Sequence, residues 1–138
     1  MTREQKLDAV YRLFKWLNSV AETGEAMKIE DIRAIFTDKA PMMLNGQKIC
    51  YDHATHFKHA LDLQSQMAKW RFNIPFEREI VEGDQVVGYY TVDYEDKAGR
   101  VGQMLDLCIF TVSDNKISSI TELVHFDGQN LDIESFDG

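Results

Sequence analysis

The 138-residue sequence lacks several features that would place it in a class at once. Its two cysteines, Cys50 and Cys108, match no metal-binding or redox spacing, so we expect free thiols in a reducing compartment, the cytoplasm. No apolar run approaches the ~18 residues that a membrane span requires, and no apolar signal segment follows Met1. These absences predict a cytoplasmic protein that neither crosses a membrane nor carries a cysteine-based metal site.

Positive charge is also scarce. Lys and Arg number 15 against 23 Asp and Glu, which gives a formal net charge of −8. An acidic surface repels phosphate backbones, so we expect no nucleic-acid partner. Hydrophobic residues make up 44% of the chain and aromatic residues 11%, which is enough to build a core. The length predicts a single domain.

Helical periodicity fills the first half of the chain, and two-residue alternation fills the second. Thr2 and Gln5 have the spacing of a capping box, and Asn45-Gly46 is a strong tight-turn signal. Pro75 predicts an interruption in the strand that contains it. We expect helices over 2–23, 29–36 and 52–69, a hairpin over 40–50, and strands over 72–82, 85–95, 100–113 and 116–127.

This order predicts an α+β fold. Three N-terminal helices should cover the concave face of a curved, mostly antiparallel sheet, giving a cone-shaped domain that encloses a pocket. The connections after residue 71 are too short for crossover helices, which excludes a parallel arrangement of the later strands. We expect residues 1–127 to form the single domain and residues 128–138 to form an acidic C-terminal tail.

Three stretches, 13–18, 31–38 and 109–127, resemble the nuclear transport factor 2-like superfamily, which includes ketosteroid isomerase, limonene epoxide hydrolase and polyketide-cyclase-like proteins. They read Leu-Phe-Lys-Trp-Leu-Asn, Asp-Ile-Arg-Ala-Ile-Phe-Thr-Asp, and the closing hairpin that begins Ile-Phe-Thr-Val. The resemblance extends from about residue 7 to residue 127. It implies a cone-shaped fold with a pocket and leaves the activity open, because this fold hosts many unrelated functions.

The sequence departs from the catalytic patterns of that superfamily. Ketosteroid isomerase-like members carry a tyrosine, an aspartate and a second carboxylate where this chain has Leu13, Leu44 and Cys108. Their chemistry is therefore not expected here. The Arg-x-Asp pair of epoxide hydrolase-like members is also missing from the similar stretch 89–93. Only their acidic residue on the last strand has a counterpart, Glu122.

Asp106 and Glu122 are the predicted catalytic carboxyls. Asp106 shares one strand face with Met104, Cys108 and Phe110, so its side chain should point inward and lose hydration. Desolvation raises the pKa of a carboxyl toward the range of a general acid or base. The adjacent last strand should bring Glu122 close, and two carboxyls in one apolar pocket split their pKa values. The alternatives are that Asp106 has a purely structural role, hydrogen-bonded to neighbouring strand or loop groups, and that Glu122 faces solvent.

The same strand phase predicts a ligand-binding set. Tyr90 and Tyr94 should point into the pocket, and Cys108 should line it as an inert thiol. Ordinary core packing is the alternative for both tyrosines.

The third helix should contribute its apolar face. Phe57 and His53 should lie on that face, with His56 on its shoulder, and His53 could assist proton transfer or be a hydrogen-bonded core residue. His59 should point to solvent, so the three histidines spread around the helix and no metal site is expected. The predicted face consists of Ala54, Phe57, Leu61, Gln64 and Ala68.

Two classes of function follow. One is a small-molecule binding protein or cofactor-free acid–base enzyme acting on an apolar molecule, of isomerase, dehydratase, cyclase or hydrolase type. The other is a non-catalytic, dimerising binding or adaptor module. Leu105, Leu107 and Ile109 should form an apolar outer face on the sheet, which soluble monomers avoid, and this predicts a homodimer.

Overall fold

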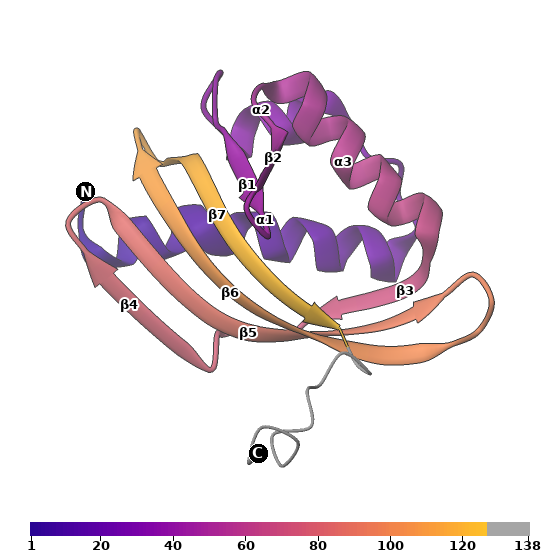
Figure 1. The fold of residues 1–138 in the computed structure, drawn as a ribbon. Helices are drawn as coiled ribbons and strands as arrows, with labels where there is room; N and C mark the ends of the chain where they lie inside the picture. Colours follow the sequence, from indigo (N-terminus) through magenta and orange to yellow (C-terminus); the bar gives the residue numbers. More distant parts are fainter. Residues whose placement is uncertain (127–138) are drawn as a thin grey trace, which may run out of the picture.

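The computed structural model describes residues 1–126, which form three helices on one side of a curved, seven-stranded sheet (Figure 1). The helices are α1 (Arg3–Thr23), α2 (Ile29–Ile35) and α3 (His53–Gln66). The strands are β1 (Met42–Leu44), β2 (Gln47–Cys50), β3 (Met67–Phe72), β4 (Arg78–Glu82), β5 (Gln85–Asp96), β6 (Val101–Ser113) and β7 (Lys116–Phe126). The α+β prediction is confirmed, and the expected tail, 128–138, lies outside the described residues.

The sheet runs in the order β2-β1-β7-β6-β5-β3, with β4 also paired to β5. The long strands β5, β6 and β7 are antiparallel neighbours, as expected from their short connections. Among the strands of residues 1–126, only β1 runs parallel to its neighbour, β7. Within residues 1–126 this order ends at two free edges, so the curved sheet does not close into a barrel, and its concave face is open to the helices.

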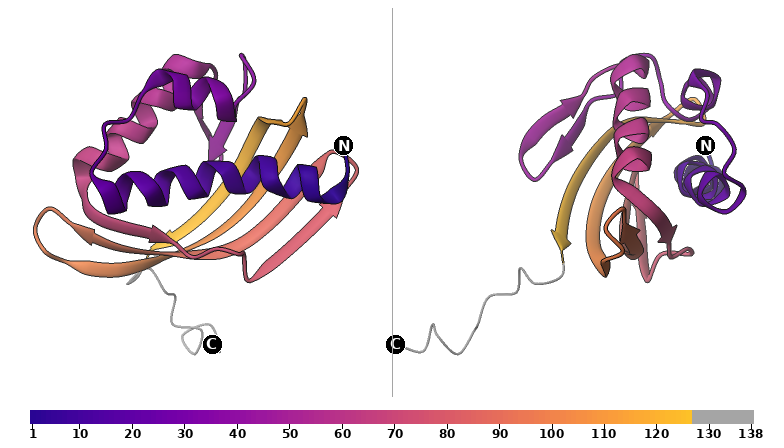
Figure 2. Two further views of the ribbon diagram at one scale, coloured as in Figure 1. Left: turned by 180° about the vertical axis from the view of Figure 1, so that it is seen from behind. Right: turned by 90° about the vertical axis from the view of Figure 1, so that its right-hand side faces the viewer.

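Helix α1 lies across that concave face (Figures 1 and 2). It begins with the predicted capping box between Thr2 and Gln5, and it ends at Gly24, whose φ of 70° gives a left-handed cap. The indole N–H of Trp70 on β3 donates to the carbonyl of Leu17 at 2.9 Å. This bond joins α1 to the sheet within the core. No helix among residues 1–126 is long and apolar enough to cross a membrane.

The region around Pro75 differs from the prediction. Helix α3 ends at Gln66 rather than near residue 69, and the expected strand 72–82 is two strands, β3 and β4, separated around Pro75. Both pair with the same edge of β5, β3 at its end and β4 at its beginning. Trp70 and Phe72 are both buried two residues apart, so strand alternation begins before residue 72. Because these two rings are buried in the core, the chain leaves the helical conformation after Gln66 and continues as strand β3.

Helix α3 is also rotated from its predicted orientation. Its buried residues are His56 and Ala60, whereas Ala54 and Leu61 are exposed. The ring of His56 stacks on Phe36 with centroids 3.9 Å apart and an interplanar angle of 15°. Hydrophobicity alone places Leu61 inside, but hydrogen bonding and stacking make the buried histidine favourable.

Candidate functional site

A cavity of about 400 Å³ lies between the three helices and the concave face of the sheet. Leu13 on α1, Ile32 on α2 and His56 on α3 line it from the helical side. Most of the lining is apolar or aromatic, as in small-molecule sites. Its aromatic rings include those of Phe14, Trp16, Phe36, Phe72, Tyr90 and Phe110.

Two carboxyl groups reach this cavity from adjacent strands. Asp106 on β6 is only 2% exposed and lies directly opposite Tyr90 of β5. Glu122 on β7 lies directly opposite Cys108 of β6. One carboxylate oxygen of Asp106, one of Glu122 and the sulfur of Cys108 lie within 4.8 Å of one another. The two-residue alternation of β6 places Asp106 and Cys108 on one face, and the register with β7 brings Glu122 beside them.

The backbone of Glu122 is fixed by the β1–β2 hairpin. Leu44 pairs with Glu122, and the N–H of Asn45 donates to the Glu122 carbonyl at 2.9 Å. The Asn45 side-chain oxygen accepts the N–H of Val124 at 3.0 Å. Asn45 and Gly46 form the predicted turn, with φ values of 48° and 84°. This turn therefore holds the strand that carries Glu122.

The electrostatics of the two carboxyls are those of a pair that shares a proton. Burial raises the pKa of Asp106, and hydrogen bonding by Glu122 and Tyr90 lowers it in part. Burial also raises the pKa of Glu122, and its hydrogen bond to Asp106 and the Asp106 charge raise it further, to well above the ordinary range. The pKa of Glu122 is raised more strongly than that of Asp106, which favours Glu122 as the proton-bearing member of the pair. Two unlike carboxyls side by side supply an acid and a base at once.

One oxygen of Asp106 has no hydrogen-bond partner among residues 1–126. Oδ1 is buried, and within the described part of the chain nothing hydrogen-bonds to it. An unsatisfied buried acceptor costs about 1–3 kcal/mol. Such an atom is expected in a site that is completed by a ligand.

Tyr90 is held against this pair as a neutral group. Its hydroxyl lies 3.3 Å from the sulfur of Cys108. Burial raises the pKa values of Tyr90 and Cys108 well above their ordinary ranges, so both keep their protons. The ring of Tyr90 stacks on Phe76 with centroids 4.8 Å apart. Gly88 makes room for this stack, because a Cβ there would lie 2.5 Å from the Phe76 ring.

Solved structures with the same arrangement of elements share little sequence with this chain. A protein from Jannaschia sp. proposed to be a SnoaL-like polyketide cyclase has a TM-score of 0.70 and 16% identity, over 88% of this chain and 85% of its own. A nuclear transport factor 2-like protein of unknown function from Exiguobacterium sp. has a TM-score of 0.72 and 16% identity, over 85% of this chain and 98% of its own. A limonene epoxide hydrolase-like enzyme from M. tuberculosis has a TM-score of 0.68 and 14% identity, over 88% of this chain and 84% of its own.

The chain has the nuclear transport factor 2-like fold. The predicted resemblance is thereby confirmed at the level of fold. No protein-family model matches the sequence, and no curated protein matches it significantly. The fold thus places a cavity without assigning a reaction to it.

Within the nuclear transport factor 2-like fold, Leu13, Leu44 and Cys108 all line the cavity. These are the positions at which the resemblance leads one to expect the polar groups of ketosteroid isomerase-like members. The cavity wall is therefore apolar on α1 and β1, and its buried carboxyls sit on β6 and β7.

Five of the predicted site residues line the cavity, namely Tyr90, Asp106, Cys108, Glu122 and His56. The imidazole Nε2 of His56 lies 2.6 Å from the carbonyl oxygen of Ala40. A carbonyl only accepts, so this nitrogen carries a proton and donates it. Burial lowers the pKa of His56, which keeps the ring neutral.

Three predicted residues lie elsewhere. His53 does not line the cavity, and its Nε2 lies 2.9 Å from the carbonyl oxygen of Phe36. Phe57 is half-buried against the core outside the cavity. Tyr94 also lies outside it, with its ring over Gly102. The rotation of α3 explains why His53 and Phe57 lie outside the cavity. Tyr94 lies outside it because it is near the end of β5.

Sequence reasoning missed the contribution of α1 and the mouth of the cavity. Phe14 and Trp16 line it from α1, and His59, Asp62 and Gln66 line it from the more exposed side of α3. The sequence signal for the contribution of α1 was its wide apolar stripe, because a helix that is covered on one side only needs a narrow apolar stripe.

Asp106, Cys108 and Glu122 are the one group of potential metal ligands found within residues 1–126. To bind a divalent ion they would have to lose the Cys108 proton and the proton shared by the carboxyls. Burial opposes both losses because it raises the three pKa values. The donor set is therefore a poor match for a metal ion.

Proposed function

We propose that the cavity binds a small, largely apolar molecule and that Asp106 and Glu122 move a proton to or from it without a cofactor. The observation that carries this proposal is a pair of neighbouring carboxyls, with oxygens within 4.8 Å and raised pKa values, inside a mostly apolar cavity. Asp106 would act as base and Glu122 as acid. Proton transfer of this kind serves isomerisation, dehydration, cyclisation and hydrolysis alike.

The comparisons support this class of function. Two similar structures bear the names of enzymes that act on organic molecules, a polyketide cyclase and an epoxide hydrolase. A cavity of about 400 Å³ fits a ligand of modest size.

The test uses nitrobenzisoxazole, a neutral aromatic probe for a buried base. The base removes the ring C–H proton, the N–O bond breaks, and a nitrile and a coloured nitrophenolate form. We expect Asp106→Asn to lower the rate by about 100-fold or more, the usual contribution of a positioned base. Asp8→Asn makes the same chemical change on the exposed side of α1 and should leave the rate unchanged. Equal rates in wild type and Asp106→Asn would reject the proton-transfer role.

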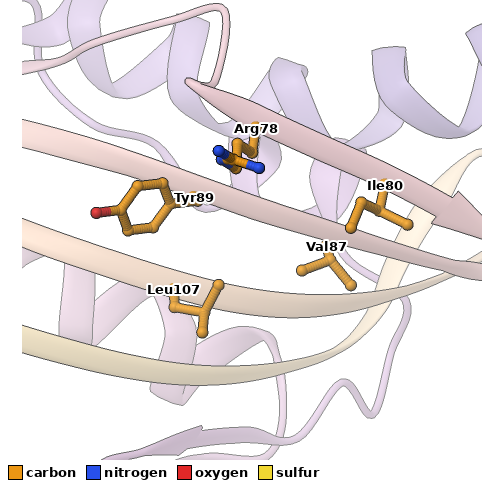
Figure 3. A pocket seen from close by; sticks show the side chains of 5 residues that line it. All are labelled: Arg78, Ile80, Val87, Tyr89 and Leu107. Carbon is orange, nitrogen blue, oxygen red and sulfur yellow. The ribbon is translucent and has the colours of Figure 1, made fainter.

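A second candidate is a dimerising binding module, supported by the outer face of the sheet. Leu105, Leu107, Ile109 and Leu123 are 37–56% exposed on that face. Figure 3 shows Leu107 beside Tyr89, Val87, Ile80 and Arg78, which line a shallow hollow there. Apolar patches of this kind mark interfaces. We propose that two copies pack through this face.

Light scattering at micromolar concentration tests the dimer. We expect twice the 15.9 kDa chain mass for wild type and a return to one chain mass for Leu107→Glu. Tyr51→Glu is the matched control, because Tyr51 is also exposed but lies beyond β2. Wild type at one chain mass would reject the dimer. We also propose a cytoplasmic location, since Cys50 and Cys108 are free and buried.

A further inference from the structure

The charge of the cavity lining is one-sided. Asp106 and Glu122 lie at its sheet side and Asp62 lies on α3, and no lysine or arginine is among the lining residues within 1–126. The Nε2 proton of His56 is donated to the Ala40 carbonyl. Burial lowers the pKa values of His56 and of His59, the other histidine of the lining. Nothing in the lining within residues 1–126 therefore offers a fixed positive charge to the Asp106 carboxyl.

The buried carboxyl of Asp106 has one oxygen to which no group among residues 1–126 donates a hydrogen bond. Asp106 Oδ1 has no hydrogen-bond partner in the described part of the chain, and the Asp106 side chain both lines the cavity and is almost fully buried. A ligand that brings an N–H group would remove this deficit. A ligand that brings only oxygen acceptors would add to it.

The remaining wall suits the body of a cation. Rings of Phe14, Trp16, Phe36, Phe72 and Tyr90 line the cavity. Aromatic faces attract ammonium groups, and aromatic cages are a known solution for binding them. The chain's net charge of −8 also favours the approach of cations over anions.

We propose that the ligand of this cavity is an amine, an apolar molecule whose protonated nitrogen donates to Asp106 and whose body packs among the rings. This ligand class depends on the proposed function, because it concerns the same cavity. An ammonium group meets the need of Oδ1 while the Cys108 thiol keeps its proton, whereas a metal ion would require the thiol to lose it.

The test compares naphthylmethylamine with naphthylmethanol by isothermal titration calorimetry at neutral pH in a metal-free buffer. The two probes have the same shape and differ in charge. We expect the amine to bind wild type at least about tenfold more tightly, which corresponds to ~1.4 kcal/mol. In Asp106→Asn the two affinities should become similar while that of the alcohol stays within about threefold.

Each outcome is decisive. Binding of the alcohol without a gain for the amine would overturn the amine and leave the proposed function standing. Failure of both probes would overturn both proposals. Tight binding of Zn²⁺ titrated alone, lost in Cys108→Ser and accompanied by no preference for the amine, would replace the amine by a metal ion. If Asp106→Asn does not fold, the wild-type comparison of the two probes decides, and Glu122→Gln, which keeps a donor to Asp106, should leave the preference for the amine in place. Loss of that preference in a folded Glu122→Gln would overturn the assignment of the amine to Asp106.

Discussion

Replacing Glu122 by glutamine should make the protein less sensitive to rising pH. In the native state Glu122 holds a proton, because burial and the neighbouring Asp106 raise its pKa well above the ordinary 4.5. In the unfolded chain that proton leaves near the ordinary value. The native state therefore binds more protons than the unfolded state between these two pKa values, and the free energy of unfolding falls as pH rises across that window.

The size of the effect follows from linkage. Each pH unit inside the window lowers the free energy of unfolding by about 1.4 kcal/mol per proton. For a domain of this length, 1 kcal/mol shifts the melting temperature by roughly 2–5 °C, so the wild-type curve should fall by about 3–7 °C per pH unit. The side-chain amide introduced by Glu122→Gln donates to Asp106 without needing that proton. This variant should therefore lack the part of the fall in melting temperature with pH that Glu122 causes.

Thermal melts followed by circular dichroism from pH 4 to pH 9, chosen as roughly the range that brackets ordinary and raised carboxyl pKa values, check this prediction. The two proteins should melt together at the acidic end, and Glu122→Gln should be the more stable one at the alkaline end. Glu77→Gln removes an exposed carboxyl and should follow wild type. Parallel wild-type and Glu122→Gln curves over the whole range would show that Glu122 ionises freely, and the shared-proton reasoning would fail.

Three further outcomes are expected. Gly88→Ala should destabilise the fold by about 1–3 kcal/mol in denaturant melts, because its Cβ would meet the Phe76 ring at 2.5 Å, and adding Phe76→Leu should recover part of the loss. Burial lowers the pKa of His56 below 6.5, so its share of stability is present above pH 6.5 and is lost as pH falls toward the native pKa; His56→Gln should flatten that acid limb, and an unchanged limb would contradict the burial argument. Trp70→Phe should cost about 1–3 kcal/mol, because it removes the hydrogen bond to the Leu17 carbonyl and part of a buried ring, and an unchanged melting temperature would show that this bond adds nothing.

Local rules were enough to predict most element boundaries. The capping box at Thr2 and Gln5 and the turn at Asn45-Gly46 are set by hydrogen bonds within a few residues, so the sequence carries them directly. The inward side of β6 was also predictable. Period-two alternation has only two phases, and Asp106 shares its phase with large apolar side chains, which the structure buries.

Helix α3 shows where local reasoning fails. A helix has many possible rotations, and the apolar pattern of 53–66 is weak enough for tertiary contacts to choose one. The choice rests on the His56 ring meeting both Phe36 and the Ala40 carbonyl, two partners that lie outside the helix. The placement of His53 and Phe57 depended on that rotation. The end of α3 at Gln66, directly before β3, likewise depends on a tertiary contact, the burial of Trp70 against α1.

The pinning of Glu122 by Asn45 limits how this protein can be redesigned. Strand β1 and the turn after it form one wall of the cavity, and this turn is hydrogen-bonded to the backbone around Glu122. A longer turn that widened the entrance would break the hydrogen bonds between Asn45 and β7. The size of the entrance and the position of Glu122 therefore cannot be varied separately at this wall. Side chains on α1, such as Leu13 and Trp16, make no such bond to β7 and are the better positions for reshaping the cavity while its chemistry is kept.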